Sequence, residues 1–133
     1  MITLIYGAKG SGKTKRIIDA ANDSVKDNKG NVIYISDRAE YSGILNIDIR
    51  FINSVEYSIQ DRAACLGFIK GILASDNDIT NVFIDGLARM AASEIGDMAA
   101  FYADLEKLAV KDKVSFTVTV STAVLPDFLK KYV

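Results

Sequence analysis

The sequence predicts an α/β fold, a three-layer sandwich in which helices cover both faces of a mostly parallel sheet of four to five strands. Short apolar runs alternate along the chain with longer segments of helical periodicity. These runs are almost wholly apolar, as expected of strands that are buried on both faces. Right-handed connections between parallel strands then place helices on both sides of the sheet. Because the chain has 133 residues, half of them apolar, we expect residues 1–133 to form a single domain.

Four apolar runs are the predicted core strands, and each is followed by a polar or turn-forming residue. They span residues 2–6, 32–35, 82–84 and 114–120. A further segment, residues 45–51, alternates apolar and polar side chains, which is typical of a half-buried strand at the edge of a sheet. The sequence therefore predicts buried core strands with an additional strand at the edge.

Three segments between the predicted strands place apolar residues at helical spacing. The stripes are Ile17, Ala21 and Val25; Ile59, Ala63, Leu66, Ile69 and Leu73; and Ile95, Met98, Tyr102, Leu105 and Ala109. Gly30 is expected to close the first helix, and Ser58 and Asp61 have the spacing of a capping box that opens the second. Pro126 is expected in the first turn of a short last helix that continues through Leu129. We expect all three stripes to pack against the sheet.

The composition excludes several classes of protein. There are 16 basic and 17 acidic residues, so the net charge is −1 and nucleic-acid binding is not indicated. The sequence has no histidine, which excludes histidine metal sites and Ser-His-Asp triads. Its single cysteine, Cys65, lies in an apolar stretch, which favours a buried thiol. No apolar run is long enough to span a membrane and residues 1–5 lack a basic leader, so we expect a cytoplasmic protein.

One segment carries a complete phosphate-binding pattern, G-x-x-x-x-G-K-[ST], between the first predicted strand and the first predicted helix. Its residues are Gly7, Ala8, Lys9, Gly10, Ser11, Gly12, Lys13 and Thr14. Glycines allow successive backbone N–H groups to surround phosphate oxygens, and the N-terminus of the helix adds positive potential. Lys13 is expected to reach the β- and γ-phosphates, and the Thr14 hydroxyl to ligate Mg²⁺. The alternative is a glycine-rich turn that binds no ligand.

Residues 7–14 resemble the Walker A motif of the P-loop NTPase superfamily, which implies a P-loop NTPase fold and a bound nucleotide. Residues 82–85, Val-Phe-Ile-Asp, resemble the Walker B motif, an apolar strand that ends in an acidic residue. Parallel strands end at one rim of the sheet, so Asp85 is expected to lie near the loop and to hold Mg²⁺ together with Thr14. The alternative for Asp85 is a turn former at the end of a strand.

The order of the elements resembles that of RecA-like ATPases. This resemblance implies that the fourth core strand lies between the first and the third, with Ser121 and Thr122 at its end beside the γ-phosphate; a polar strand terminus is the alternative. Many such ATPases have a glutamate directly after the Walker B aspartate, where this chain has Gly86. Some RecA-like members carry the glutamate after the second strand. Glu40, or else Asp37, is then the candidate that polarises the attacking water, and a solvated loop is the alternative.

We therefore expect a Mg²⁺-dependent ATPase module in which Lys13 and the loop amides offset the charge of the triphosphate. ATP is favoured over GTP by the RecA-like resemblance, since no N-K-x-D guanine signature is present. Arg38 and Arg89 are candidate phosphate contacts, with exposed charges as the alternative. A second copy or a partner protein is expected to cover the edge beside the first strand. A regulatory module that binds nucleotide without hydrolysis and a small P-loop kinase stay open as alternative functions.

Overall fold

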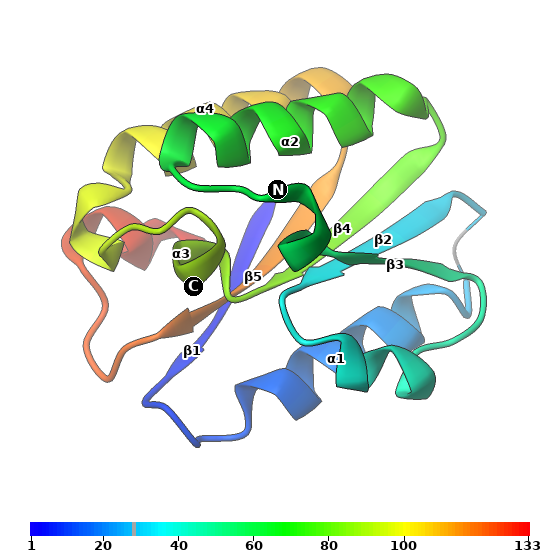
Figure 1. Ribbon diagram of the computed structural model, residues 1–133, viewed down its shortest axis with the longest axis horizontal. Coiled ribbons are helices and arrows are strands. Elements are labelled where there is room, and N and C mark those ends of the chain that lie inside the picture. The colour runs from blue at the N-terminus through cyan, green and yellow to red at the C-terminus, as the bar shows by residue number, and fades with distance from the viewer. Residues whose placement is uncertain (28) are drawn as a thin grey trace.

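The computed structural model describes residues 1–27 and 29–133, and its centre is a five-stranded sheet in which all strands are parallel. The strands are β1 (Ile2–Gly7), β2 (Asn31–Ser36), β3 (Ile49–Asn53), β4 (Ile79–Asp85) and β5 (Ser115–Ser121). Their order across the sheet is β1-β5-β4-β2-β3 (Figure 1). The α/β class and the parallel sheet are confirmed, and β5 lies between β1 and β4 as expected.

Helices cover both faces of the sheet. They are α1 (Lys13–Ser24), α2 (Arg62–Ser75), the short α3 (Leu87–Met90) and α4 (Ala99–Asp112). Helix α1 lies on one face, and α2 and α4 lie side by side on the other (Figure 1). Short 3-10 helices complete the connections: η1 (Ala39–Ile44), η2 (Ser54–Tyr57), η3 (Ile95–Asp97) and η4 (Asp127–Tyr132). Within residues 1–27 and 29–133, every helix is too short or too polar to span a bilayer.

The predicted apolar stripes pack against the sheet with one exception. Ala63 is exposed, because the buried line of α2 runs through Cys65, Ile69 and Leu73, four residues apart. Each large aliphatic side chain buried in this way contributes about 1.5–3 kcal/mol. The Cys65 thiol is fully buried, as expected, and burial raises its pKa to about 12.

The register of the sheet brings the carboxyl ends of the strands to one rim. Gly7 at the end of β1 pairs with Ser121 of β5, and Ser36 of β2 pairs with Asp85 of β4. The loop of residues 7–14 and helix α3 both begin at this rim. Side chains from separate strands can therefore meet there.

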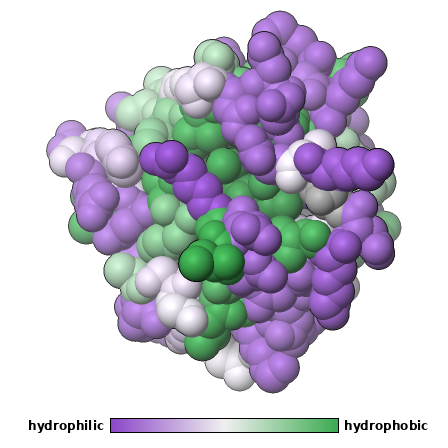
Figure 2. Space-filling view, turned by 90° about the vertical axis from the view of Figure 1, so that its right-hand side faces the viewer, coloured by the Kyte–Doolittle hydropathy of each residue, from purple (hydrophilic) through white to green (hydrophobic). Residues whose placement is uncertain are grey.

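An apolar groove of about 580 Å³ lies between α2 and the strands β2 and β3. Ile33, Ile52, Phe68 and Ile72 line it, together with Arg50. Figure 2 shows this side of the molecule, where apolar side chains gather between hydrophilic ones. Helix α2 thus covers the part of the sheet next to β3 only incompletely.

The predicted edge strand begins later than the alternation of residues suggests. Residues 45–48 precede β3, because Asn22 of α1 holds this stretch in a turn. The Asn22 side-chain amide donates to the Ile44 carbonyl oxygen at 3.0 Å, and its oxygen accepts from the Asn46 N–H at 2.7 Å. These bonds fix a turn where the sequence pattern predicts extended backbone.

The capping-box prediction for the second helix is wrong. Helix α2 begins at Arg62, and Asp61 alone is its N-cap, since the carboxylate accepts a hydrogen bond from the Ala64 N–H at 2.7 Å. Ser58 instead ends η2 in the left-handed conformation, with φ of 51°. Ile59 also lies outside α2.

Other boundaries differ as well. Helix α1 ends at Ser24 rather than near Gly30. A Cβ atom at Gly30 would collide with the Thr80 side chain, so close packing against β4 accounts for this glycine. Ile95 lies in η3, before α4, and Pro126 precedes the 3-10 helix η4 instead of opening an α-helix.

We expect Asp61→Ala to lower the free energy of unfolding by about 1 kcal/mol, because it removes the N-cap of α2. Ser58→Ala is the matched control and should change it by only a few tenths of that amount. Urea denaturation of the three proteins measures both effects. Equal losses in the two variants would contradict the assignment of the cap to Asp61.

Candidate functional site

The glycine-rich loop, residues 7–14, joins β1 to α1. Gly10 and Gly12 have φ of 83° and 86°, a left-handed conformation that residues with a Cβ rarely adopt. The Ser11 N–H donates to the Ala8 carbonyl oxygen at 3.1 Å, which closes the turn. Gly12 is the N-cap of α1 and supplies no side-chain hydrogen bond. Such a helix terminus attracts anions, because its first N–H groups and its dipole favour negative charge.

The ammonium group of Lys13 lies within this loop. Lys13 is only 8% exposed, and its Nζ donates to the Ala8 carbonyl oxygen at 2.9 Å. Gly7 allows the loop to close this tightly, since a Cβ there would lie 2.5 Å from the Ser11 hydroxyl oxygen. The loop therefore presents backbone N–H groups and one cation at the start of α1.

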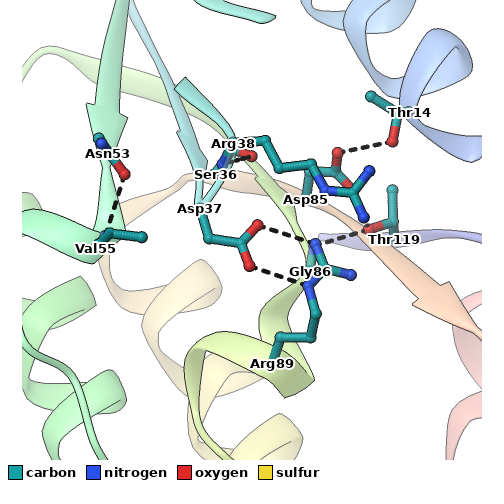
Figure 3. Close-up of polar contacts among 10 residues, drawn as sticks. All are labelled: Thr14, Ser36, Asp37, Arg38, Asn53, Val55, Asp85, Gly86, Arg89 and Thr119. Carbon is teal, nitrogen blue, oxygen red and sulfur yellow. Dashed lines mark hydrogen bonds and ion pairs between the residues drawn. The ribbon is translucent and has the colours of Figure 1, made fainter. Parts of the chain in front are cut away.

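Asp85, at the end of β4, is held from two sides. It is 6% exposed; the Thr14 hydroxyl donates to its Oδ2 at 3.0 Å and the Thr119 hydroxyl donates to its Oδ1 at 2.8 Å. The Thr119 oxygen in turn accepts from the Gly86 N–H at 3.0 Å (Figure 3). One carboxylate thus joins the first turn of α1, the strand β5 and the turn between β4 and α3.

A second acidic residue of the rim is paired with an arginine. Nε and one terminal nitrogen of Arg89 donate to the two carboxylate oxygens of Asp37, both at 3.0 Å (Figure 3). These hydrogen bonds and the positive charge hold the pKa of the Asp37 carboxyl below its ordinary value. Bonding to Asp37, and the charges of Asp37 and Asp85, raise the pKa of Arg89. The side chains of Arg89 and Asp37 are 45% and 28% exposed.

Two features of this turn favour a glycine at position 86. Its φ is 89°, and a Cβ atom placed on it would collide with the guanidinium group of Arg89. Arg89 therefore folds back over the residue that follows Asp85. A residue with a side chain at position 86 would have its Cβ in the space that the guanidinium takes.

These groups surround a cleft of about 590 Å³ with an excess of positive charge. Its charged lining residues are Lys9, Lys13, Arg38, Arg89 and Asp85. Thr14, Tyr41 and Ser121 also line it. A chain whose net charge is −1 thus gathers four cations against one carboxylate in a single cleft. Such a site favours a polyanion.

The structure brings some predicted site residues together and leaves others apart. Lys13, Thr14 and Asp85 line the cleft, and Ser121 does so at the end of β5. Asp37 and Glu40 are not among the lining residues: the first is bonded to Arg89, and the second is exposed in η1. Thr122 forms a local turn in which its hydroxyl donates to the Val124 carbonyl oxygen at 2.8 Å.

Sequence reasoning missed two polar residues, Thr119 and Tyr34. Thr119 precedes Ser121 by two positions, so strand periodicity would have placed both side chains on one face of the sheet. Tyr34 is fully buried on β2, and among the described residues its hydroxyl has no hydrogen-bond partner. Burial, with further contributions from Asp85 and Tyr41, raises the pKa of Tyr34. The phenol therefore stays neutral and able to donate.

The oxygen atoms at this rim fit Mg²⁺ as part of a nucleotide complex. The Thr14 hydroxyl and the Asp85 carboxylate are hard oxygen donors, which Mg²⁺ prefers. In the part of the chain that the structure describes, no cluster of three or more acidic or thiol side chains could hold a metal unaided. Mg²⁺ usually takes one or two protein ligands and completes its coordination with phosphates and waters.

The sequence matches no protein-family model and no curated protein.

We expect Asp37→Asn to lower the free energy of unfolding by up to about 1 kcal/mol at pH 7, because it removes a partly exposed ion pair. Since Arg89 lowers the pKa of Asp37, this stabilisation is present above the ordinary carboxyl pKa of about 4 and is lost as Asp37 is protonated at lower pH. Urea denaturation at several pH values measures the difference. A difference of the same size at pH 7 and pH 2.5 would contradict the ion pair, and Asp48→Asn, at an exposed aspartate before β3, is the control.

Proposed function

We propose that this chain is an ATP-binding domain of the P-loop NTPase superfamily and acts as a Mg²⁺-dependent ATPase of RecA-like type. The observation that carries the proposal is the hydrogen bond of 3.0 Å between the Thr14 hydroxyl and the Asp85 carboxylate. It joins the end of a glycine-rich loop to the end of β4, and both residues line a cationic cleft. A phosphate-binding loop beside an acidic strand end is the arrangement that a Mg²⁺-nucleotide site requires.

Phosphate binding is supported by the loop and its lysine. The left-handed glycines and the uncapped N-terminus of α1 provide backbone N–H groups for the α- and β-phosphates. Lys13 exchanges its bond to the Ala8 carbonyl for the β- and γ-phosphates. Lys9 and Arg38 add charge to the same cleft. Because these groups are already assembled, the protein contributes positioning and charge neutralisation.

Thr14 and Asp85 are the residues that would hold Mg²⁺. When bound, the ion neutralises charge on the β- and γ-phosphate oxygens. Thr119 keeps the Asp85 carboxylate oriented, since its hydroxyl bonds the Oδ1 oxygen and is itself fixed by the Gly86 N–H. A ligand oriented by a second hydrogen bond is typical of metal sites in proteins.

The strand order favours the RecA-like branch over a small P-loop kinase. Strand β5 lies between β1 and β4, which is the order that the resemblance implies. Ser121, at the end of β5, lines the cleft beside Asp85 and is the candidate γ-phosphate sensor. We also propose that a second copy of the chain covers β1, which is an edge strand of the sheet. Light scattering with and without Mg²⁺-ATP tests this association, and a strict monomer in both conditions contradicts it.

Binding without hydrolysis is a second candidate function. The scarcity of carboxylates among the lining residues of the cleft favours it. Among the described residues that line the cleft, Asp85 is the only carboxylate, and Gly86 follows it. Glu40 and Asp37 stay hypotheses for the group that polarises water. Steady release of phosphate from ATP supports the ATPase, whereas tight ATP binding with no release over hours supports a regulatory module.

Calorimetric titration with ATP, ADP and GTP, with and without Mg²⁺, tests the proposal directly. We expect Lys13→Ala to weaken ATP binding by about a hundredfold or more, because it removes the ammonium group from the phosphate site. Lys15→Ala is the matched control, since that neighbouring lysine is exposed and pairs with Asp19. Wild-type affinity in Lys13→Ala, with an unchanged thermal unfolding temperature, would refute the phosphate site.

We expect Asp85→Asn to abolish the gain in ATP affinity that Mg²⁺ provides, while binding of metal-free ATP changes little. An amide oxygen is a weaker Mg²⁺ ligand than a carboxylate. Lys13, the cation proposed for the phosphates, donates to the Ala8 carbonyl oxygen rather than to Asp85, so its contribution to binding is kept. Thr119→Val should weaken the same Mg²⁺ dependence roughly tenfold, because it frees the Asp85 carboxylate to rotate. Titration of ATP at increasing Mg²⁺ concentrations measures both. An undiminished Mg²⁺ effect in Asp85→Asn would remove this residue from the metal site.

A further inference from the structure

Arg89 stands between the cationic cleft and Asp37. Its guanidinium group folds back over Gly86, directly after Asp85, and lines the cleft together with Lys13 and Thr14. On its other side it donates two hydrogen bonds of 3.0 Å to Asp37, which follows β2 (Figure 3). The guanidinium thus borders the proposed phosphate site while a carboxylate occupies two of its donors.

A phosphate group would compete with Asp37 for these donors. Guanidinium groups bind carboxylates and phosphates through the same pair of parallel N–H donors. The ion pair is partly exposed, with 45% of Arg89 and 28% of Asp37 accessible, and partly exposed pairs are weak. A terminal phosphate carries more negative charge than a carboxylate. A terminal phosphate beside the guanidinium would therefore compete with Asp37 for its donors.

We propose that Arg89 contacts the γ-phosphate of a bound nucleoside triphosphate, and that Asp37 holds its guanidinium beside the cleft until the γ-phosphate arrives. This inference rests on the proposed function. Asp37 is then a positioning residue that competes with the ligand. The pair distinguishes triphosphate from diphosphate, because the α- and β-phosphates bind the loop at the start of α1.

Gly86 is part of the same arrangement. Any larger residue would place its Cβ in the space of the Arg89 guanidinium, so that guanidinium would have to move from its present position. In this chain the guanidinium group of Arg89 lies over Gly86, the position that carries an acidic side chain in many RecA-like ATPases. Arg89 thus stabilises charge on the γ-phosphate, a different task from polarising water.

Titration with the β,γ-imido analogue of ATP and with ADP, both with Mg²⁺, tests the inference without turnover. We expect Arg89→Ala to weaken binding of the analogue roughly tenfold to a hundredfold and to leave ADP binding within about twofold. Arg50→Ala is the matched control, since Arg50 lies in the apolar groove on β3. Asp37→Asn should bind the analogue roughly threefold to tenfold more tightly, with ADP unchanged, because it releases Arg89. Asp48→Asn is its control.

The outcomes separate this inference from the proposed function. If the wild type binds neither nucleotide, the proposed function itself fails. If the wild type binds both but Arg89→Ala weakens ADP and the analogue equally, or neither, the role of Arg89 is refuted and the nucleotide site stands. If Asp37→Asn weakens the analogue, Asp37 is not a competitor and that part is refuted. Comparing the two ligands on one folded variant removes any general loss of stability from the result, and thermal unfolding confirms that each variant is folded.

Discussion

The position of Asp85 is the constraint on which the site depends. Its two carboxylate oxygens accept hydrogen bonds from Thr14 and Thr119, which belong to different elements. Each partner is fixed by the fold: Thr14 lies in the first turn of α1, and Thr119 lies on β5, next to β4 in the sheet. A buried carboxylate needs such partners, because an unpaired charge in this environment is strongly unfavourable. The bonds therefore stabilise the rim and orient the carboxylate in one step.

Charge is distributed unevenly around this carboxylate. Lys9, Lys13, Arg38 and Arg89 line the cleft with Asp85 as their acidic counterpart. Asp37 compensates one of these cations from outside the cleft, and Gly86 makes room for that cation. The remaining positive potential is concentrated where the N-terminus of α1 also points. The positive potential of the rim thus comes from its backbone as much as from any single lysine.

The sequence predicted the fold class, the buried strands and the glycine-rich loop because these features depend on local pattern. The apolar run at residues 2–6, the complete loop motif and the apolar run that ends at Asp85 sufficed to place β1, α1 and β4 in order. Prediction from the sequence failed where contacts between distant segments override the local preference of the backbone. The turn at residues 45–48 is fixed by Asn22, and the pairing of Asp37 with Arg89 joins residues that lie 52 positions apart. No periodicity signals such contacts, whereas Thr119 could have been found from strand alternation.

The Asn22 side chain connects α1 to η1, which has a mechanical consequence. It bonds the residues at the end of η1, and Tyr41, within η1, is one wall of the cleft. The loop from which α1 begins lines the same cleft. Tyr41 and the loop are thus both connected to helix α1, so a displacement of α1 would move these two parts of the cleft together.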